Sequence, residues 1–361
     1  MSRKIIIPIF IPHLGCPHTC VFCNQKKIAG NFNKPTPQKV TDTVLAYRKT
    51  IKGKSDNTIE LAFYGGSFTA IEEEFQKQLL QTALKLKESK LIDEIRISTR
   101  PDYISPEVIN RLVTYQVNTV ELGVQSLDPQ VLAISERGHS PSSVEKAVIA
   151  LKEAKRKVGI QLMPGLPLDT REKTLVTAQK VIRLKPDFVR IYPTVVIKQT
   201  KLAEMYQKGE FQPWSLEEAI EVGALLYILF SQARIPIIRL GLQATENLCE
   251  GKDLVAGPYH PAYGELVKSR VFRKQLKYLI GAIKDSSIKN LKIYTNPREI
   301  SQVKGQHKSN VKYIQDKYGI ALEISPLANL PPGHLTFFNP STNSWVVLSR
   351  REFLDKYRIN H

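Results

Sequence analysis

The sequence lacks any hydrophobic run long enough to cross a membrane: no stretch of about 18 apolar residues occurs in it. The apolar segment near the N-terminus is interrupted by Pro8 and Pro12, which favours a strand over a signal peptide. Cysteine is scarce too. Four cysteines in 361 residues, three of them clustered, do not form a disulfide framework. We therefore expect a protein of the reducing cytoplasm without a membrane partner.

Acidic residues are also in short supply. The chain has 52 Lys and Arg against 34 Asp and Glu, a formal net charge of +18. Two blocks carry the excess: residues 1–56 hold ten basic and two acidic residues, and residues 268–317 hold thirteen and three. Such blocks favour a surface for a polyanion, with nucleic acid as the first candidate. The alternative is that the lysines are merely solvated.

Three of the four cysteines occur in the segment Cys16-Pro17-His18-Thr19-Cys20-Val21-Phe22-Cys23. Thiolates gathered in this way bind a metal or a cluster, or perform redox chemistry. A structural zinc site needs a fourth ligand, for which His13 or His18 is the candidate. Three thiolates suit a 4Fe–4S cluster better, because one iron then stays open for a substrate. We expect Cys249, far along the chain, to be a thiol outside this site.

Short apolar runs alternate with amphipathic stretches, which is the pattern of repeated βα units around a parallel sheet. We expect strands at Ile5–Ile11, Ile59–Tyr64, Glu94–Thr99, Thr119–Val124, Val158–Met163 and Phe188–Pro193. We expect helices at Lys39–Thr50, Ile71–Leu86, Pro106–Tyr115, Pro141–Lys155, Thr170–Leu184, Leu216–Ala233 and from Gly264 to about Ile283. Six such strands form a doubly wound sheet or an incomplete (β/α) barrel. The repeat fades after Pro193, and we place a domain boundary near Gln243, with a core of 1–243 and a basic α+β extension of 244–361.

Unusual polar residues directly follow the expected strands. After the cysteine loop come Gly65-Gly66-Ser67, Arg100-Pro101-Asp102, Gln125-Ser126, Pro164-Gly165-Leu166-Pro167 and the pair Arg190 and Tyr192. In barrels and open parallel sheets, ligands bind at the carboxyl ends of the strands. The agreement among these segments predicts one shared active site.

The pattern Cys-x3-Cys-x-aromatic-Cys, with Phe22 as the aromatic residue, resembles the signature of the radical S-adenosylmethionine (radical SAM) superfamily. The resemblance implies an enzyme with an incomplete (β/α)6 barrel. In that family three cysteines, here Cys16, Cys20 and Cys23, hold a 4Fe–4S cluster whose open iron binds SAM. One electron then splits SAM into methionine and a 5′-deoxyadenosyl radical, and the protein supplies placement and exclusion of water.

Further segments resemble one branch of that family. Leu122–Asp128 and Met163–Pro167 look like parts of the branch with oxygen-independent coproporphyrinogen oxidase and the Elongator catalytic subunit, and Phe63–Thr69 points to the Elongator-like group. The resemblance implies a SAM pocket made of Phe22, Gly65, Gly66, Ser98, Gln125, Arg137 and Gln161. Ser98 stands where the porphyrin enzymes often carry an acid, which argues against porphyrin chemistry. We expect no acetyltransferase domain within this sequence.

The expected substrate is tRNA or another RNA, and the expected electron donor is a protein such as flavodoxin or ferredoxin. Candidate contacts to the substrate or to a polyanion are Arg100, Arg190, Tyr192, Arg239, Lys268, Arg270, Arg273, Lys274, Lys304 and Lys308. Two alternatives stay open. One is a radical SAM enzyme that acts on a small anionic metabolite or a tetrapyrrole, and the other is a non-enzymatic iron–sulfur protein that binds RNA.

Overall fold

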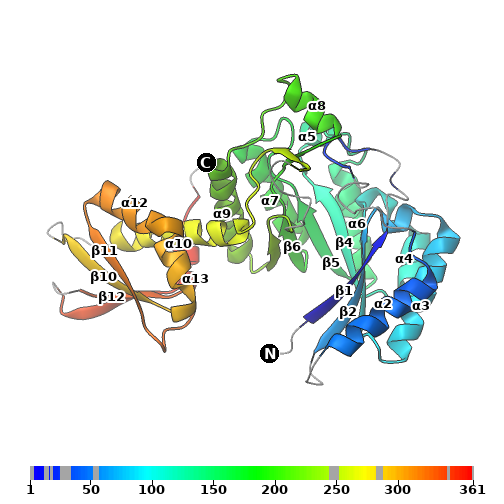
Figure 1. Ribbon diagram of the computed structural model, residues 1–361, viewed down its shortest axis with the longest axis horizontal. Helices are drawn as coiled ribbons and strands as arrows, with labels where there is room; N and C mark the ends of the chain where they lie inside the picture. Colours follow the sequence, from blue (N-terminus) through cyan, green and yellow to red (C-terminus); the bar gives the residue numbers. More distant parts are fainter. Residues whose placement is uncertain are drawn as a thin grey trace. The chain divides into compact units, whose positions relative to one another are not determined.

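The computed structural model describes residues 4–11, 16, 19–24, 34–51, 57–243, 252–281, 288–339 and 342–359 (Figure 1). His13, His18 and Cys249 lie outside these residues. The chain forms two compact units. The first comprises Met1–Trp214 and Gln243–Pro258, and the second comprises Ser215–Leu242 and Tyr259–His361.

Parallel strands in sequence order build the first unit. They are β1 (Lys4–Ile11), β2 (Thr58–Gly65), β3 (Glu94–Thr99), β4 (Thr119–Gln125), β5 (Lys157–Leu162) and β6 (Phe188–Ile191). Each strand pairs in parallel with the next. The sheet curls into an incomplete barrel with helices along its outer side (Figure 1). The predicted incomplete barrel is confirmed, but its sheet has seven strands and not six, because β8 (Ile237–Leu240) follows β6 in the strand order. The carboxyl ends of β1 to β6 meet at one edge.

Most helices of the first unit begin at a side-chain cap. The helices of this unit are α2 (Pro37–Thr50), α3 (Glu73–Glu88), α4 (Pro106–Thr114), α5 (Pro129–Ile134), α6 (Pro141–Glu153), α7 (Arg171–Leu184) and α8 (Lys201–Gln207). Of these, α3 is the exception without a side-chain cap. The side chains of Thr36, Ser105, Asp128 and Ser140 each accept a hydrogen bond from a first-turn N–H, and each is followed by proline. A capping oxygen followed by proline at the first helical position strongly favours a helix start. The short strands β7 (Val196–Ile197) and β9 (Leu254–Ala256) form an antiparallel pair.

The second unit combines helices with a four-stranded sheet. Its elements are α9 (Leu216–Gln232), β8 (Ile237–Leu240), α10 (Tyr263–Gly281), β10 (Asn290–Thr295), α11 (Ile300–Lys304), α12 (Ser309–Tyr318), β11 (Ala321–Pro326), β12 (Leu335–Asn339), β13 (Ser344–Leu348) and α13 (Arg350–Lys356). The sheet order is β11-β10-β12-β13. Strands β10 and β11 are parallel, and the other two pairs are antiparallel. The predicted α+β character of this region is therefore present.

The two compact units do not have the predicted bounds of 1–243 and 244–361, because α9 and β8 lie in the second unit. A capping box of Ser215 and Glu218 starts α9, which packs on α10 of the same unit. The Tyr263 hydroxyl donates to the carbonyl of Ala219 at 2.7 Å. The division into a catalytic core and a basic extension stays a prediction. None of the helices in the described ranges is long and apolar enough to span a membrane.

Candidate functional site

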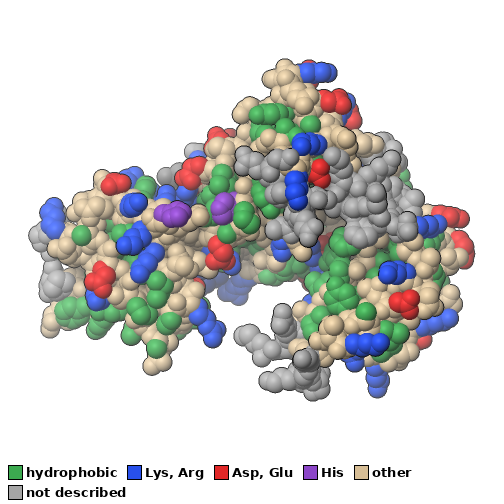
Figure 2. Space-filling view, in the orientation of Figure 1, with side chains coloured by type: hydrophobic (Ala, Val, Ile, Leu, Met, Phe, Trp, Pro, Cys, Tyr) green, Lys and Arg blue, Asp and Glu red, His purple; other side chains and the backbone are tan. Residues whose placement is uncertain are grey.

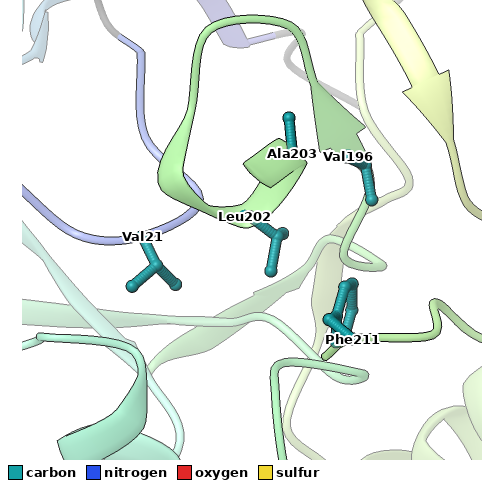
Figure 3. Packing of buried hydrophobic residues seen from close by; sticks show 5 residues of the cluster. All are labelled: Val21, Val196, Leu202, Ala203 and Phe211. Atoms are coloured by element: carbon teal, nitrogen blue, oxygen red, sulfur yellow. The ribbon is translucent and has the colours of Figure 1, made fainter. Parts of the chain in front are cut away.

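An apolar anchor holds the cysteine loop in place. Val21, between Cys20 and Cys23, is 1% exposed and belongs to a cluster of buried side chains, shown in Figure 3. The other members are Val196, Leu202, Ala203 and Phe211. The Val21 N–H donates to the Ser135 carbonyl at 3.2 Å, and the Val21 carbonyl accepts from the Leu202 N–H at 2.7 Å. Burial and two backbone bonds thus fix the loop against segments distant in sequence.

The three thiols differ in exposure: Cys20 is buried, whereas Cys16 and Cys23 are half-buried. The Cys23 N–H donates to the Cys20 carbonyl at 2.9 Å, which closes a turn between them. Burial raises the pKa of the Cys16 thiol, although the backbone N–H of Ser67 hydrogen-bonds to it and two guanidinium groups lie near. Coordination to a metal centre deprotonates a thiol outright. A buried thiol in this setting is compatible with a ligand role.

The spacing of the ligand atoms gives a test of the metal type. Among the described residues, no three His, Cys, Asp or Glu side chains are grouped closely enough to hold one metal ion. Tetrahedral zinc with Zn–S bonds of about 2.3 Å would bring its sulfurs to about 3.8 Å from one another. Thiolates that bind separate irons of one cluster are free of that requirement. The donor set itself, three cysteine thiols, is one that such a cluster uses.

The glycine turn after β2 packs directly on β1. Gly65 has φ +108°, and a Cβ there would lie 2.3 Å from the carbonyl oxygen of Ile11. The same carbonyl accepts from the Gly66 N–H at 3.0 Å. Only glycine combines this backbone conformation with so close an approach. The predicted glycine motif thus has a local structural cause, and the backbone N–H of the next residue, Ser67, hydrogen-bonds to the Cys16 thiol.

Hydroxyl groups that the sequence reasoning missed connect the ends of β2 and β3. The Ser67 and Thr99 hydroxyls are 2.9 Å apart, and the Thr69 hydroxyl is 2.6 Å from that of Thr99. The Arg100 N–H donates to the Ser67 hydroxyl at 3.1 Å. All four residues are buried. The Gly-Gly-Ser and Ser-Thr-Arg segments were the available signal, because each follows a strand that is adjacent in the sheet.

Arg137 brings a buried positive charge to the thiols. Its Nη1 donates to Cys20 Sγ at 3.1 Å, and its Nη2 donates to the Gly123 carbonyl. Its Nε is buried and has no hydrogen-bond partner among the described residues. The guanidinium lies 6.0 Å from the centre of the Phe22 ring. An unmet buried donor on a guanidinium beside the thiol loop fits a carboxylate of a bound cofactor.

Arg100 supports Arg137 from behind. Its Nη2 donates to the backbone carbonyl of Arg137, and its guanidinium grips Asp102 with two bonds of 3.0 and 2.8 Å. Arg100 is 4% exposed. Asp102 therefore compensates its charge. The hydrogen bonds of Arg100 to Asp102 and to the Arg137 carbonyl indicate a structural role, which is to hold Arg137 in position. The sequence prediction that it contacts substrate has no support from these contacts.

Two predicted pocket residues meet at the ends of β4 and β5. Gln125 has φ +67° and lies in an irregularity of the pairing between β4 and β5. The Gln161 Nε2 donates to the Gln125 Oε1 at 3.3 Å. A Cβ on Gly123 would lie 3.2 Å from the Gln125 Nε2. The irregular backbone redirects the Gln125 side chain toward Gln161 and Gly123, next to Arg137.

Below these residues, an ionic network fills the barrel interior. Arg96 pairs with Glu60 at 2.6 Å and also with Glu121, and Arg190 pairs with Glu121 at 3.0 Å. Glu60 is fully buried, and Arg96 and Glu121 are 3% and 5% exposed. Ser98, two residues after Arg96, is half-buried and in phase with it on β3. The predicted pocket residue Ser98 therefore faces the interior above this network.

Arg190 and Tyr192 belong to the same network. The Arg190 guanidinium donates to the Tyr64 hydroxyl at 3.0 Å and to the Tyr192 hydroxyl at 3.2 Å. Burial and the nearby Glu121 carboxylate raise the pKa of Tyr64, which keeps its phenol protonated. The sequence placed Arg190 and Tyr192 in the interior as possible substrate contacts. The structure gives Arg190 protein partners on two strands.

The predicted polyanion contacts of the second unit fall into two groups. Arg270 is 8% exposed and pairs with Glu217 and Glu221 of α9, and Lys274 also pairs with Glu221. Arg273 donates to the Asn310 side chain at 2.8 Å and lies 4.8 Å from the centre of the Tyr313 ring.

The remaining residues have weaker ties. Lys268 pairs with Glu265 on the surface, Arg239 donates to the Gly241 carbonyl, and Lys304 and Lys308 are half-buried and exposed. Arg270 and Lys274 are thus paired with acids of their own unit, and we remove both from the set of candidate polyanion contacts. Both were chosen by charge alone, and the acids that neutralise them lie about 50 residues earlier in the chain.

Comparison with known proteins agrees with this geometry. Residues 10–180 match the family model "Radical SAM superfamily", and residues 186–273 match "Radical_SAM C-terminal domain". A tRNA uridine(34) acetyltransferase of Methanocaldococcus infernus is 33% identical over 264 residues, which cover 62% of this chain and 49% of that protein. The chain thus spans about half the length of this relative.

Two further likenesses extend the match. An uncharacterised protein of Methanocaldococcus jannaschii is 32% identical over 227 residues, covering 58% of this chain and 67% of that protein. The solved structure of the archaeal M. infernus Elp3 with an N-terminal deletion has the same fold, with a TM-score of 0.60 and 24% identity; the match covers 96% of this chain and 77% of that one. With its thiol loop at the carboxyl edge of an incomplete barrel, the chain belongs to the radical SAM superfamily of enzymes, whose cofactors are a 4Fe–4S cluster and S-adenosylmethionine.

Proposed function

We propose that Cys16, Cys20 and Cys23 hold the 4Fe–4S cluster of this enzyme and that its radical chemistry modifies tRNA or another RNA. The observation that carries the first half is the contact between Arg137 and Cys20, 3.1 Å long and buried at the carboxyl edge of the barrel. This contact places the Arg137 guanidinium, whose Nε–H has no partner among the described residues, beside the thiol loop. A cofactor that binds both the thiol loop and a cation would require this arrangement. When bound, the cluster supplies the electron that cleaves SAM reductively.

The chain's own residues would bind and orient SAM. The Arg137 guanidinium would hold the carboxylate of SAM through its unmet Nε–H. The backbone at Gly65 and Gly66, which no Cβ covers, would receive the amino group. Gln125 and Gln161, already hydrogen-bonded to each other, would bind the ribose hydroxyls. Phe22, packed on the apolar cluster of Figure 3, would help to exclude water from the site.

Two observations support RNA as the substrate: the name of a relative and the net positive charge of this chain. The first relative described above is named a tRNA uridine(34) acetyltransferase, and this chain covers 49% of it. The excess of Lys and Arg in residues 1–56 and 268–317 suits a phosphate backbone. Arg270 and Lys274 are excluded from the proposed surface by their acidic partners, whereas Lys304 and Lys308 are retained. A flavodoxin or ferredoxin as donor and a cytoplasmic location belong to the same proposal.

The cluster assignment is tested on anaerobically reconstituted protein. The wild type is expected to bind about four irons and four sulfides per chain and to release 5′-deoxyadenosine from SAM when reduced with dithionite. Cys20→Ala should lose the cluster absorbance and the cleavage, and Cys249→Ala should retain both. Cleavage that persists in Cys20→Ala would refute the assignment.

The RNA substrate is tested in cells. Nucleosides from tRNA of cells with and without this protein are compared by mass spectrometry, and one modified nucleoside should disappear when the protein is absent. Return of that nucleoside with the wild-type protein, but not with Cys20→Ala, would link the modification to the cluster. An unchanged nucleoside profile, together with SAM cleavage in vitro, would instead favour a small-molecule substrate.

A further inference from the structure

The sheet of the second unit has one buried and one exposed face. Along β10, Leu291, Ile293 and Thr295 are buried, whereas Lys292 is exposed and Tyr294 is half-buried. Strand β11 alternates in the same way. Helices α11 and α12 pack against β11. One face of the sheet therefore contributes to the core of this unit, and the other carries a separate set of side chains.

Aromatic rings gather on the exposed face. Trp345 on β13 and Phe338 on β12 stand directly opposite each other, and they are 55% and 43% exposed. The centre of the Trp345 ring is 5.8 Å from that of Phe338 and 5.6 Å from that of Tyr294 on β10. Val347, 52% exposed, extends the patch along β13. Figure 2 shows hydrophobic side chains gathered over this sheet.

Such a patch has no function in the core of its own unit. Large apolar side chains grouped on a surface commonly mark a binding site. The three rings meet edge to face, at 60° and 69°, so that they present their surfaces in different directions across the sheet. Flat side chains on an open sheet are well suited to stacking against planar ligands, and nucleobases that are unpaired are the planar groups of a single strand.

The charge of this part of the chain helps to select among partners. Residues 288–361 hold eleven Lys and Arg against five Asp and Glu. Lys289 is exposed next to the start of β10, and the Lys292 Nζ lies 5.8 Å from the centre of the Tyr294 ring. Glu323 pairs with Lys292 at 2.7 Å and offsets that one charge. Protein–protein interfaces are depleted of Lys at their centres, whereas a basic groove with aromatic rings is typical of sites for single-stranded nucleic acid.

We propose that the face formed by Tyr294, Phe338 and Trp345 binds single-stranded RNA by stacking nucleobases on its rings, with Lys289 near the phosphates. The inference rests on the proposed function, because it supplies a docking site for the RNA substrate. It predicts a preference for unpaired nucleotides over a duplex, whose bases are covered by their neighbours. It also predicts that sequence preference is weak, because every base has a π-face.

Direct stacking is measured through tryptophan fluorescence in the full chain. The sequence has two tryptophans, Trp214 and Trp345, so the variant Trp214→Phe reports on Trp345 alone. A ten-nucleotide oligouridine RNA should quench this emission, and an RNA duplex of equal length should quench it much less. An independent titration, with fluorescently labelled oligouridine and the native Trp214, avoids any effect of that substitution. Equal quenching by the duplex and the single strand would contradict stacking.

The energetic test replaces the central ring. Trp345→Ala is expected to weaken oligouridine binding about 5- to 150-fold, the range for loss of one stacked base, and Trp345→Phe should restore most of it. Leu168→Ala, at a residue of the first unit that is 62% exposed, is the control for loss of a surface apolar side chain and should bind as the wild type does. Circular dichroism and thermal unfolding confirm that each variant is folded.

Two results would overturn the inference. Oligouridine binding that is equally tight in Trp345→Ala and the wild type would exclude stacking on this face. A wild-type dimer in sedimentation that Trp345→Ala converts to monomers, with RNA binding unchanged, would assign the face to a second copy of the chain. Failure of the proposed function is a separate observation: the reconstituted wild type would then release no 5′-deoxyadenosine from SAM, whatever the oligouridine titration gives.

Discussion

The first unit buries an ionic network inside its barrel, whereas the second unit exposes a sheet face of aromatic rings. In the first unit, Glu60, Arg96, Glu121 and Arg190 are removed from water inside the barrel and neutralise one another. In the second unit, the exposed sheet face carries rings, and pairs such as Lys268 with Glu265 remain at the surface. A buried ionic network holds its side chains in one arrangement, but removal of one member leaves a buried charge that is poorly compensated. A surface with exposed rings and charges keeps its side chains available for a partner.

The largest effect expected from this comparison is at Arg96. Arg96→Met would leave Glu60 with only the partly exposed Lys4, and Glu121 with only Arg190, as cationic partners. We expect a loss of about 3–5 kcal/mol in the free energy of unfolding, which is typical when one member of a buried ion pair is removed. Chemical denaturation measures it. Lys268→Met, which breaks an exposed pair of the second unit, is the matched variant and should cost no more than about 0.5 kcal/mol. Equal losses in the two variants would refute the contrast.

A second contrast concerns two glycines with positive φ. In Gly65→Ala the new Cβ would meet the Ile11 carbonyl at 2.3 Å, whereas nothing lies within 4 Å of the corresponding position at Gly319 of the second unit. We expect Gly65→Ala to lose about 3 kcal/mol of stability and Gly319→Ala about 1 kcal/mol, because only the first combines backbone strain with a clash. Thermal unfolding of both variants checks this. A smaller loss for Gly65→Ala would mean that β1 can move away from the turn.

Two half-buried carboxyl groups should give stability a pH dependence of opposite sign. Burial raises the pKa of Asp169 to about 6, although the Gly165 N–H and the Thr174 hydroxyl hydrogen-bond to it. Its neutral form is therefore favoured in the folded chain, so stability falls as the pH rises from about 4, where the unfolded carboxyl ionises, to about 6, by up to about 3 kcal/mol in all. For Glu221, burial is outweighed by Lys274 and Arg270, which lower its pKa. Its contribution is present above the ordinary carboxyl range and is lost as the pH falls below it.

Denaturation curves between pH 3 and 7 separate the two groups. Asp169→Asn should remove the loss of stability between about pH 4 and 6 and leave the loss at lower pH intact. Glu221→Gln should flatten the acid limb and leave the region near pH 6 unchanged. If Asp169→Asn has the same pH profile as the wild type, the carboxyl group is charged in the fold and the assigned direction is wrong.

The sequence predicted the first unit well because its signals are local. Strands β1 to β6 follow from apolar runs, and the amphipathic pattern predicted the starts of α2, α4 and α6 to within two residues. The short helices α5 and α8 were missed. They have six and seven residues, which is less than two turns and too short to show a helical period in the sequence. The hydroxyl contact of Ser67 with Thr99 and the pairing of Arg96 with Glu60 could not be predicted, because they depend on strand register.

The second unit shows why charge in a sequence is an unreliable guide to a surface. Arg270, Lys274 and Lys308 look equivalent in the composition of residues 268–317, yet the first two face acids of α9. The aromatic face escaped notice for a similar reason. Tyr294, Phe338 and Trp345 come from three strands, and only the strand order β10-β12-β13 brings them together.

The smallest expected effect tests the difference between a basic residue that is exposed and one that is paired with an acid. If RNA phosphates contact the exposed Lys308, Lys308→Gln should weaken tRNA binding slightly, by less than about 1 kcal/mol, and reduce the slope of log K against log salt by about 0.9. Lys274→Gln should leave the slope unchanged, because Glu221 already neutralises this ammonium group in the free protein. The two variants remove the same charge from neighbouring elements of one unit, so that net charge alone predicts equal slopes. Filter-binding titrations of tRNA from 50 to about 300 mM salt, compared for the two variants and the wild type, decide whether the pairing or the composition governs binding.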